Sequence, residues 1–159
     1  MRAGRVSTTK ILGVLVQIGL HASVDDRPLF RNHPETRRRI IAATLFDRLG
    51  GADGIRRIVG VLVDNHAKNP VVAPRFAGSD MKNLKKMAGD FFIAGSGGPE
   101  IYTGKDMIAA HKHMNISGDE FVAVLDDAMN ALQANNVGQR EQEEVLFNLY
   151  SLKDQVVGI

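Results

Sequence analysis

From about residue 44 onward, hydrophobic residues recur at steps of three and four, which is the spacing of one face of an α-helix. The pattern is clear in four stretches, which are 52–68, 81–95, 118–134 and 139–157. Shorter helices are expected near 71–76 and 105–113, and a short first helix ends at Gly50-Gly51. No stretch shows the two-residue alternation that is typical of a half-buried strand. The pattern therefore predicts an all-α domain over residues 42–159.

The predicted helices end at residues that interrupt helices. Asn69 precedes Pro70, and the residue before a proline avoids the helical region of backbone space. Ser117 with Glu120 three residues later has the spacing of a capping box, which starts a helix. The glycine-rich stretch 95–99 lacks the Gly-Lys-Ser/Thr ending of a phosphate-binding loop, so we interpret it as a hinge.

Composition excludes several kinds of site. The chain has 159 residues, of which 44% are hydrophobic and 24% charged, as in an ordinary single domain. It has no cysteine, which excludes disulfides, cysteine-held zinc or iron–sulfur clusters, and thiol catalysis. Neighbouring carboxylates at 119–120, 126–127 and 143–144 point about 100° apart on a helix, so we interpret them as solvent-exposed faces rather than metal sites.

Charge is unevenly divided along the chain. Residues 1–41 carry eight Lys or Arg against three Asp or Glu, whereas residues 42–159 carry twelve against fifteen. The predicted domain is thus mildly acidic, which is unlike a nucleic-acid-binding module. The N-terminal extension has a basic start, an apolar run at 11–20 and small residues around Ala22, which is the outline of a signal peptide. The run is too short to span a membrane, and we favour a disordered extension and a cytoplasmic location over export.

Two histidines, His111 and His113, are the candidate ligands for a metal or cofactor. Two residues apart on a helix, they point to roughly opposite sides and cannot share one metal. Met107 lies one turn before His111, and Ile108 and Met114 flank the same side, so His111 is expected to face the core and His113 the solvent. Spacing alone leaves two interpretations open, a satisfied core histidine and a ligand.

Five stretches follow one another in order along the predicted domain, which are LFDRLGG at 45–51, NPVVAPRFAGSDMKNLKK at 69–86, FF at 91–92, GGPEIYTGKDM at 97–107 and AHKHMNISGDEF at 110–121. Together they resemble the truncated haemoglobins of the first group, which have a two-over-two helical sandwich around haem. The step from Met107 to His111 matches the position of the family's proximal ligand. The resemblance therefore implies haem b held by His111 through its iron, and diatomic ligands such as oxygen, carbon monoxide and nitric oxide.

The resemblance also implies which side chains surround the haem. By the family pattern Phe76 packs on the haem. Phe91 and Phe92 lie in the distal wall, with Leu84 at the distal gate. Tyr102 matches a residue near the haem edge. The expected lining of the proximal and inner pocket consists of Met107, Ile108 and Val124.

The distal side departs from the family pattern. Many members have a Phe-Tyr pair and a Gln, of which the tyrosine hydroxyl and the glutamine amide hydrogen-bond to bound oxygen. The matching residues here are Leu62, Val63 and Ala88. Loss of such hydrogen bonds predicts fast oxygen escape and poor discrimination against carbon monoxide. Met87 is placed either to pack over the haem edge or to act as an internal sixth ligand. His66, one turn beyond Leu62, could approach the pocket, but we favour its interpretation as a partly exposed histidine at the helix end.

We therefore expect a haem protein that binds diatomic gases at a five-coordinate iron. The resemblance also implies nitric oxide dioxygenation with a reductase partner, but the apolar distal side favours simple ligand or oxygen binding over an enzyme. One alternative is an electron-transfer or sensor globin ligated by Met87. Another is a helical interaction module that has lost its haem.

Overall fold

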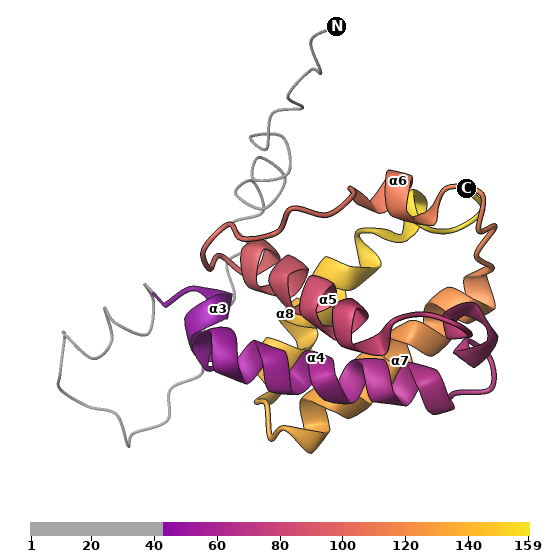
Figure 1. The fold of residues 1–159 in the computed structure, drawn as a ribbon. Helices are drawn as coiled ribbons and strands as arrows, with labels where there is room; N and C mark the ends of the chain where they lie inside the picture. The colour runs from indigo at the N-terminus through magenta and orange to yellow at the C-terminus, as the bar shows by residue number, and fades with distance from the viewer. Residues whose placement is uncertain (1–42) are drawn as a thin grey trace, which may run out of the picture. The chain divides into compact units, whose positions relative to one another are not determined.

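The computed structural model describes residues 43–159, which form a bundle of helices (Figure 1). The predicted extension at 1–41 lies outside the described residues. Within the described part there is no β-strand, only an isolated bridge between Ile116 and Val157, so the predicted all-α fold is confirmed. In chain order the elements are α3 (Leu45–Arg48), α4 (Gly51–Lys68), η2 (Ala73–Phe76), α5 (Met81–Gly95), α6 (Met107–His111), α7 (Gly118–Ala134), α8 (Gln139–Tyr150) and η3 (Lys153–Gln155).

The structure confirms two of the predicted helix boundaries. Helix α4 ends at Lys68, and the next residue, Asn69, is already extended ahead of Pro70. Helix α7 begins after Ser117, whose side chain accepts a hydrogen bond from the Glu120 N–H while the Glu120 carboxylate accepts one from the Ser117 N–H. This capping box satisfies two backbone donors that would otherwise lack partners at the start of the helix.

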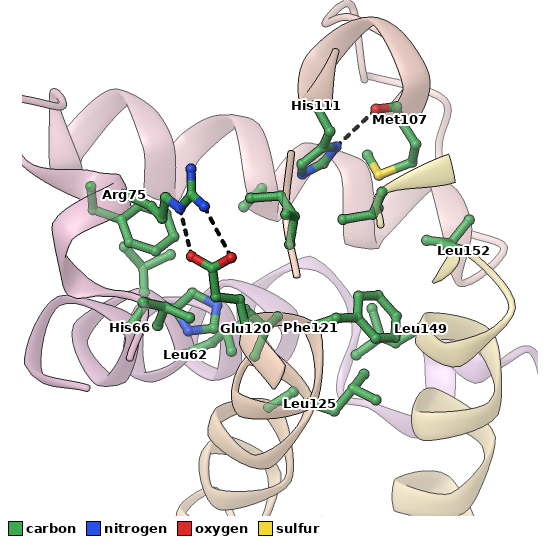
Figure 2. A pocket seen from close by; sticks show the side chains of 18 of the residues that line it. Leu62, His66, Arg75, Met107, His111, Glu120, Phe121, Leu125, Leu149 and Leu152 are labelled. Atoms are coloured by element: carbon green, nitrogen blue, oxygen red, sulfur yellow. Dashed lines mark hydrogen bonds and ion pairs between the residues drawn. The ribbon is translucent and has the colours of Figure 1, made fainter. Parts of the chain in front are cut away.

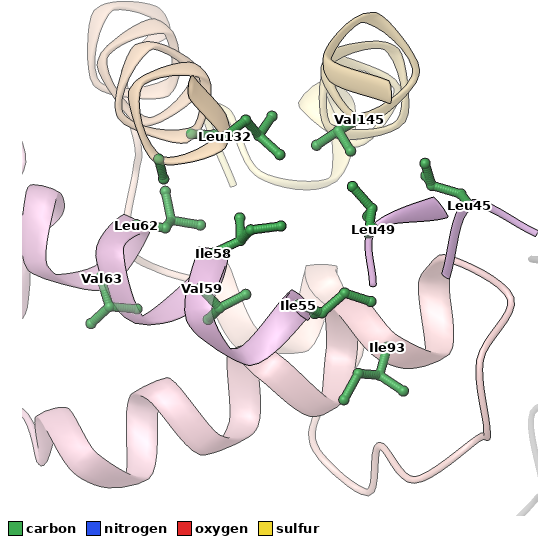
Figure 3. Packing of buried hydrophobic residues seen from close by; sticks show 12 residues of the cluster. Leu45, Leu49, Ile55, Ile58, Val59, Leu62, Val63, Ile93, Leu132 and Val145 are labelled. Atoms are coloured by element: carbon green, nitrogen blue, oxygen red, sulfur yellow. The ribbon is translucent and has the colours of Figure 1, made fainter. Parts of the chain in front are cut away.

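The helices are held together by an aliphatic core around α4. Helix α4 packs against both α5 and α7, and α7 packs in turn against α8. Figure 3 shows the apolar face of α4 directed at side chains from the neighbouring helices. The labelled core residues are Leu45, Leu49, Ile55, Ile58, Val59, Leu62, Val63, Ile93, Leu132 and Val145. Burial of such side chains from water supplies most of the free energy that holds helices together.

The last helix is shorter than its hydrophobic spacing predicts. The prediction of one helix over 139–157 is wrong after Tyr150, where α8 ends. The chain then turns and runs toward the loop that follows α6, where the Gly158 N–H donates to the carbonyl oxygen of Ile116 at 3.0 Å. A β-type contact thus competes successfully with continued helix, and it brings the C-terminus beside α6 (Figure 1).

Helix α6 is a single short segment. The Asp106 side chain caps its start by accepting a hydrogen bond from the Ala109 N–H at 2.7 Å, and the helix ends at His111. The predicted helix near 105–113 is therefore too long, because His113 has the left-handed backbone angle φ of 70°. His113 is exposed, as expected, although the turn and not a helical face sends it outward.

No helix between residues 43 and 159 is long and apolar enough to cross a membrane.

Candidate functional site

A cavity of about 270 Å³ lies between the helices and is enclosed mainly by apolar side chains (Figure 2). Helices α4, α5, α6, α7 and α8 all contribute to its wall, as do η2 and the segments that follow α6 and α8. Among the lining residues, the ionisable side chains are His66, Arg75, His111 and Glu120. The apolar ones are Leu62, Val63, Val72, Phe76, Leu84, Ala88, Phe91, Phe92, Met107, Met114, Ile116, Phe121, Val124, Leu125, Ala128, Leu149, Leu152 and Val156.

The early end of α8 helps to close this cavity. Leu149 comes from the last turn of α8, and Leu152 and Val156 come from the segment that turns away after it. The turn after Tyr150 directs Leu152 and Val156 to the cavity, where they join Leu149. The turn after Tyr150 therefore completes one wall of the cavity.

His111 presents one particular ring nitrogen to the cavity. Its Nδ1 atom lies 2.8 Å from the carbonyl oxygen of Met107, one turn earlier on α6 (Figure 2). A carbonyl oxygen can only accept, so Nδ1 carries the proton and donates it. In the neutral imidazole, Nε2 then keeps its lone pair, which is the form in which histidine binds a metal. A hydrogen bond from the other ring nitrogen also fixes the orientation of a ligating imidazole.

Most of the residues predicted around a haem lie around this one cavity. They come from four helices and from η2, and they are separated by up to 62 positions in the sequence. The predicted residues that line it together with His111 are Leu62, Val63, Phe76, Leu84, Ala88, Phe91, Met107 and Val124.

Three predicted residues lie elsewhere. Met87 is half-buried on α5, and Ile108 is 53% exposed on α6, and neither lines the cavity. Tyr102 stands behind the wall, where its ring meets the edge of Phe91 with the ring centres 5.4 Å apart. Its hydroxyl donates to the carbonyl oxygen of Lys105 at 2.7 Å. Burial, and then the charge of Asp106, raise the pKa of Tyr102.

The α4 and α5 walls of the cavity carry no hydrogen-bond donor at the positions where relatives are expected to have them. Leu62 and Val63 face the cavity from α4, and Leu84 and Ala88 face it from α5. Leu62 and Val63 are also almost fully buried, at 6% and 2% exposure. This part of the wall can exclude water but cannot hydrogen-bond to a ligand.

An ion pair stands at another part of the wall. The Arg75 guanidinium donates from Nε and Nη2 to the two carboxylate oxygens of Glu120 at 2.6 and 3.0 Å, and from Nη1 to the carbonyl oxygen of Met114 at 2.9 Å. The hydrogen bond from Arg75, and next the one from the Ser117 N–H, lower the pKa of Glu120 to about 2. The pair therefore stays charged at neutral pH and joins η2 to the start of α7.

Two buried polar residues were misread from the sequence. His66 is 7% exposed and lines the cavity, so its interpretation as a partly exposed residue at the helix end is wrong. Asp127 is 6% exposed, so the interpretation of 126–127 as a solvent-exposed pair fails for the second residue. The cause is their pairing, because His66 Nδ1 lies 2.7 Å from Asp127 Oδ2. Helical spacing could not reveal a contact between residues 61 positions apart.

The donor set fits haem better than a bare metal ion. Among the described residues no group of three His, Asp or Glu side chains is placed to hold a metal ion directly. An iron ion bound by a single imidazole needs its other ligands from elsewhere, and a porphyrin supplies four nitrogens in a plane. The apolar wall suits the apolar disc of the porphyrin.

The helical sandwich and a cavity with one oriented imidazole together define a globin-like protein. A model of the bacterial-like globin family matches residues 44–157, and the chain belongs to this family. Membership implies a haem cofactor and the binding of diatomic gases.

Sequence relatives and solved structures agree with this assignment. A group 1 truncated hemoglobin from Mycolicibacterium paratuberculosis is 28% identical over 119 residues, which cover 75% of this chain and 88% of the relative. The Fe(III) truncated hemoglobin from Tetrahymena pyriformis superposes with a TM-score of 0.71 at 26% identity, over 74% of this chain and 100% of that one. A 2/2 hemoglobin from Synechococcus gives a TM-score of 0.66 at 26% identity, over 71% and 95%. The predicted resemblance to group 1 truncated haemoglobins and the two-over-two fold are confirmed.

Proposed function

We propose that this protein binds haem b through Nε2 of His111 and holds diatomic gases in the adjoining cavity. The observation that carries the proposal is the hydrogen bond from His111 Nδ1 to Met107, which leaves Nε2 as the ligating nitrogen in an apolar cavity. When bound, the haem would supply reversible binding of small gases through its iron.

The remaining lining residues position the cofactor and keep the site dry. Phe76 and Phe91 offer flat apolar surfaces to the porphyrin, and Met107 and Val124 fill the wall near His111. Leu62, Val63, Leu84 and Ala88 exclude water from the space where a gas molecule is held. Exclusion of water matters because it protects a ferrous haem from side reactions.

The apolar wall determines which gas is held well. Oxygen becomes partly negative on binding to ferrous haem and gains from a hydrogen bond worth about 1–3 kcal/mol. Carbon monoxide and nitric oxide are less polarised and lose less when that donor is missing. We infer a function in gas binding with rapid oxygen exchange. This makes nitric oxide dioxygenation with a reductase partner the weaker proposal, since that reaction needs oxygen to be retained.

The placement of Met87 argues against a role for its thioether as an iron ligand. Met87 is half-buried on α5 and is not among the residues that line the cavity. A thioether that does not face the cavity is poorly placed to ligate an iron held by His111. An electron-transfer or sensor globin with Met87 as sixth ligand is therefore the second candidate.

A visible spectrum of the full chain reconstituted with haem tests the proposal. We expect a five-coordinate high-spin ferrous spectrum that changes to a six-coordinate one when carbon monoxide is added. A six-coordinate low-spin ferrous spectrum without added ligand would instead support Met87 ligation. Absence of a Soret band would leave only the helical interaction module.

A further inference from the structure

The wall of the cavity contains a buried histidine–carboxylate pair that haem ligation through His111 does not use. His66 on α4 and Asp127 on α7 are 7% and 6% exposed, and His66 Nδ1 lies 2.7 Å from Asp127 Oδ2. A charged side chain that is buried without a partner costs free energy. A buried histidine and a buried carboxylate therefore need a hydrogen bond to each other, as these two have.

The imidazole ring of His66 is held in one orientation. The Phe76 ring stacks on it with ring centres 5.4 Å apart and planes 7° from parallel. Asp127 is fixed as well, since its Oδ1 accepts a hydrogen bond from Asn69 Nδ2 at 3.1 Å. With Nδ1 bound to Asp127, Nε2 is the nitrogen left for the cavity that His66 lines, and it has no hydrogen-bonding partner among residues 43–159. Figure 2 shows His66 and His111 entering the cavity from different elements.

Asp127 also reaches the outside of the molecule. It lines an open, polar surface depression together with Asn65, Lys68, Asn69 and Asn130. The carboxylate thus stands between water in the depression and the ring of His66, and His66 stands between the carboxylate and the cavity. This order of groups provides a route for protons from the surface to an otherwise apolar interior.

We propose that the His66–Asp127 pair is a switchable hydrogen-bond donor to the ligand in the cavity, supplied with protons through the surface depression. While His66 is neutral, its Nδ1–H donates to the Asp127 carboxylate and its Nε2 can only accept, which disfavours a partly negative ligand. When His66 takes up a proton from water, Nε2–H becomes a donor and the carboxylate balances the charge. The proposal rests on the proposed function, because it assumes that haem and a gas occupy the cavity.

Other charged groups near His66 do not provide the same switch. Glu120 keeps its charge down to a pKa of about 2 and is paired with Arg75, whose pKa is raised by that pairing. Helix α5 contributes only apolar side chains to the cavity. The titratable or charged groups that line the cavity or the depression are His66 and Lys68 from α4, Arg75 from η2, His111 from α6, and Glu120 and Asp127 from α7.

The C–O stretching frequency of the ferrous carbon monoxide complex tests the proposal, because a donor to the ligand lowers it. We expect the haem-reconstituted full chain to show two C–O bands whose relative intensities change with pH. His66→Leu should leave only the higher-frequency band at every pH. Asp127→Asn keeps the size and the Nδ1 acceptor but removes the balancing charge, so it should move this change to lower pH.

Control variants and the absorption spectrum distinguish failure of this inference from failure of the proposed function. His113→Leu and Asp126→Asn change exposed residues of the same types and should behave as the unmodified chain does. A normal Soret band with a C–O stretch that responds neither to pH nor to His66→Leu would overturn this inference alone. A missing Soret band would overturn the proposed function and this inference together.

Discussion

Nδ1 of His111 lies 2.8 Å from the carbonyl oxygen of Met107, which is one helical turn earlier in the chain. This contact reaches back from the last residue of the short helix α6 to its first residue and orients the imidazole. The hydrogen bond thus selects the nitrogen that is available to iron.

The apolar wall predicts that a single hydroxyl will change oxygen binding. Val63→Tyr places a donor on α4 at a position that lines the cavity. We expect oxygen dissociation to slow by about ten- to hundredfold, because a hydrogen bond to a charged or strongly polarised acceptor contributes about 1–3 kcal/mol. Stopped-flow measurement of the oxygen off-rate checks this.

Val63→Phe is the control for bulk without the hydroxyl. If the phenylalanine variant slowed oxygen escape as much as the tyrosine variant, steric blocking and not hydrogen bonding would explain the effect. An unchanged off-rate in Val63→Tyr would show that the wall described for this cavity is not the wall that the ligand meets.

The Arg75–Glu120 pair predicts how stability depends on acid. The pKa of Glu120 is lowered from 4.5 to about 2, so the folded state favours the charged carboxylate. The resulting stabilisation is complete above the ordinary pKa and is lost as pH falls from about 4.5 to about 2. Glu120→Gln should therefore be less stable than the unmodified chain at neutral pH, with a difference that shrinks over this range.

Urea unfolding at a series of pH values measures that difference. Glutamine can still accept the hydrogen bond from the Ser117 N–H, so the variant isolates the loss of charge from the loss of the helix cap. A stability difference that stayed constant down to the lowest pH would contradict an ionic origin.

Two glycines on α4 predict opposite effects of the same substitution. At Gly54 an added Cβ would overlap the carbonyl oxygen of Leu49, whereas at Gly60 it would meet no atom within 4 Å. We expect Gly54→Ala to destabilise the fold by about 1–3 kcal/mol through overpacking. Gly60→Ala should stabilise it by about 0.5–1 kcal/mol through helix propensity. Thermal unfolding of both variants checks the contrast, and equal effects would contradict this packing of α3 against α4.

Sequence reasoning located the fold well where local chemistry decides it. Asn69-Pro70 and the Ser117–Glu120 box gave correct helix boundaries because proline geometry and capping act within a few residues. The predicted end of the last helix was wrong, because the helix stops at Tyr150 and the chain turns to form a contact between Val157 and Ile116. These two residues are about forty positions apart, so helical spacing does not reveal their contact.

At the site, too, a contact within one helix could be predicted from the sequence, but a contact between distant helices could not. The inward placement of His111 followed from its spacing from Met107, whereas the His66–Asp127 pair joins two helices that are distant in sequence. Its two members look ordinary when read alone, a histidine near a helix end and one of several acidic residues. Only their packing across α4 and α7 makes them a buried pair.

The central claim is that His111 is the axial ligand, and the absorption spectrum of His111→Gly with one equivalent of haem tests it most directly. We predict that the variant loses the Soret band of an imidazole-ligated haem and recovers it when free imidazole is added, while the exposed control His113→Gly keeps the unmodified spectrum. A His111→Gly spectrum identical to that of the unmodified chain, with no response to imidazole, would contradict the account.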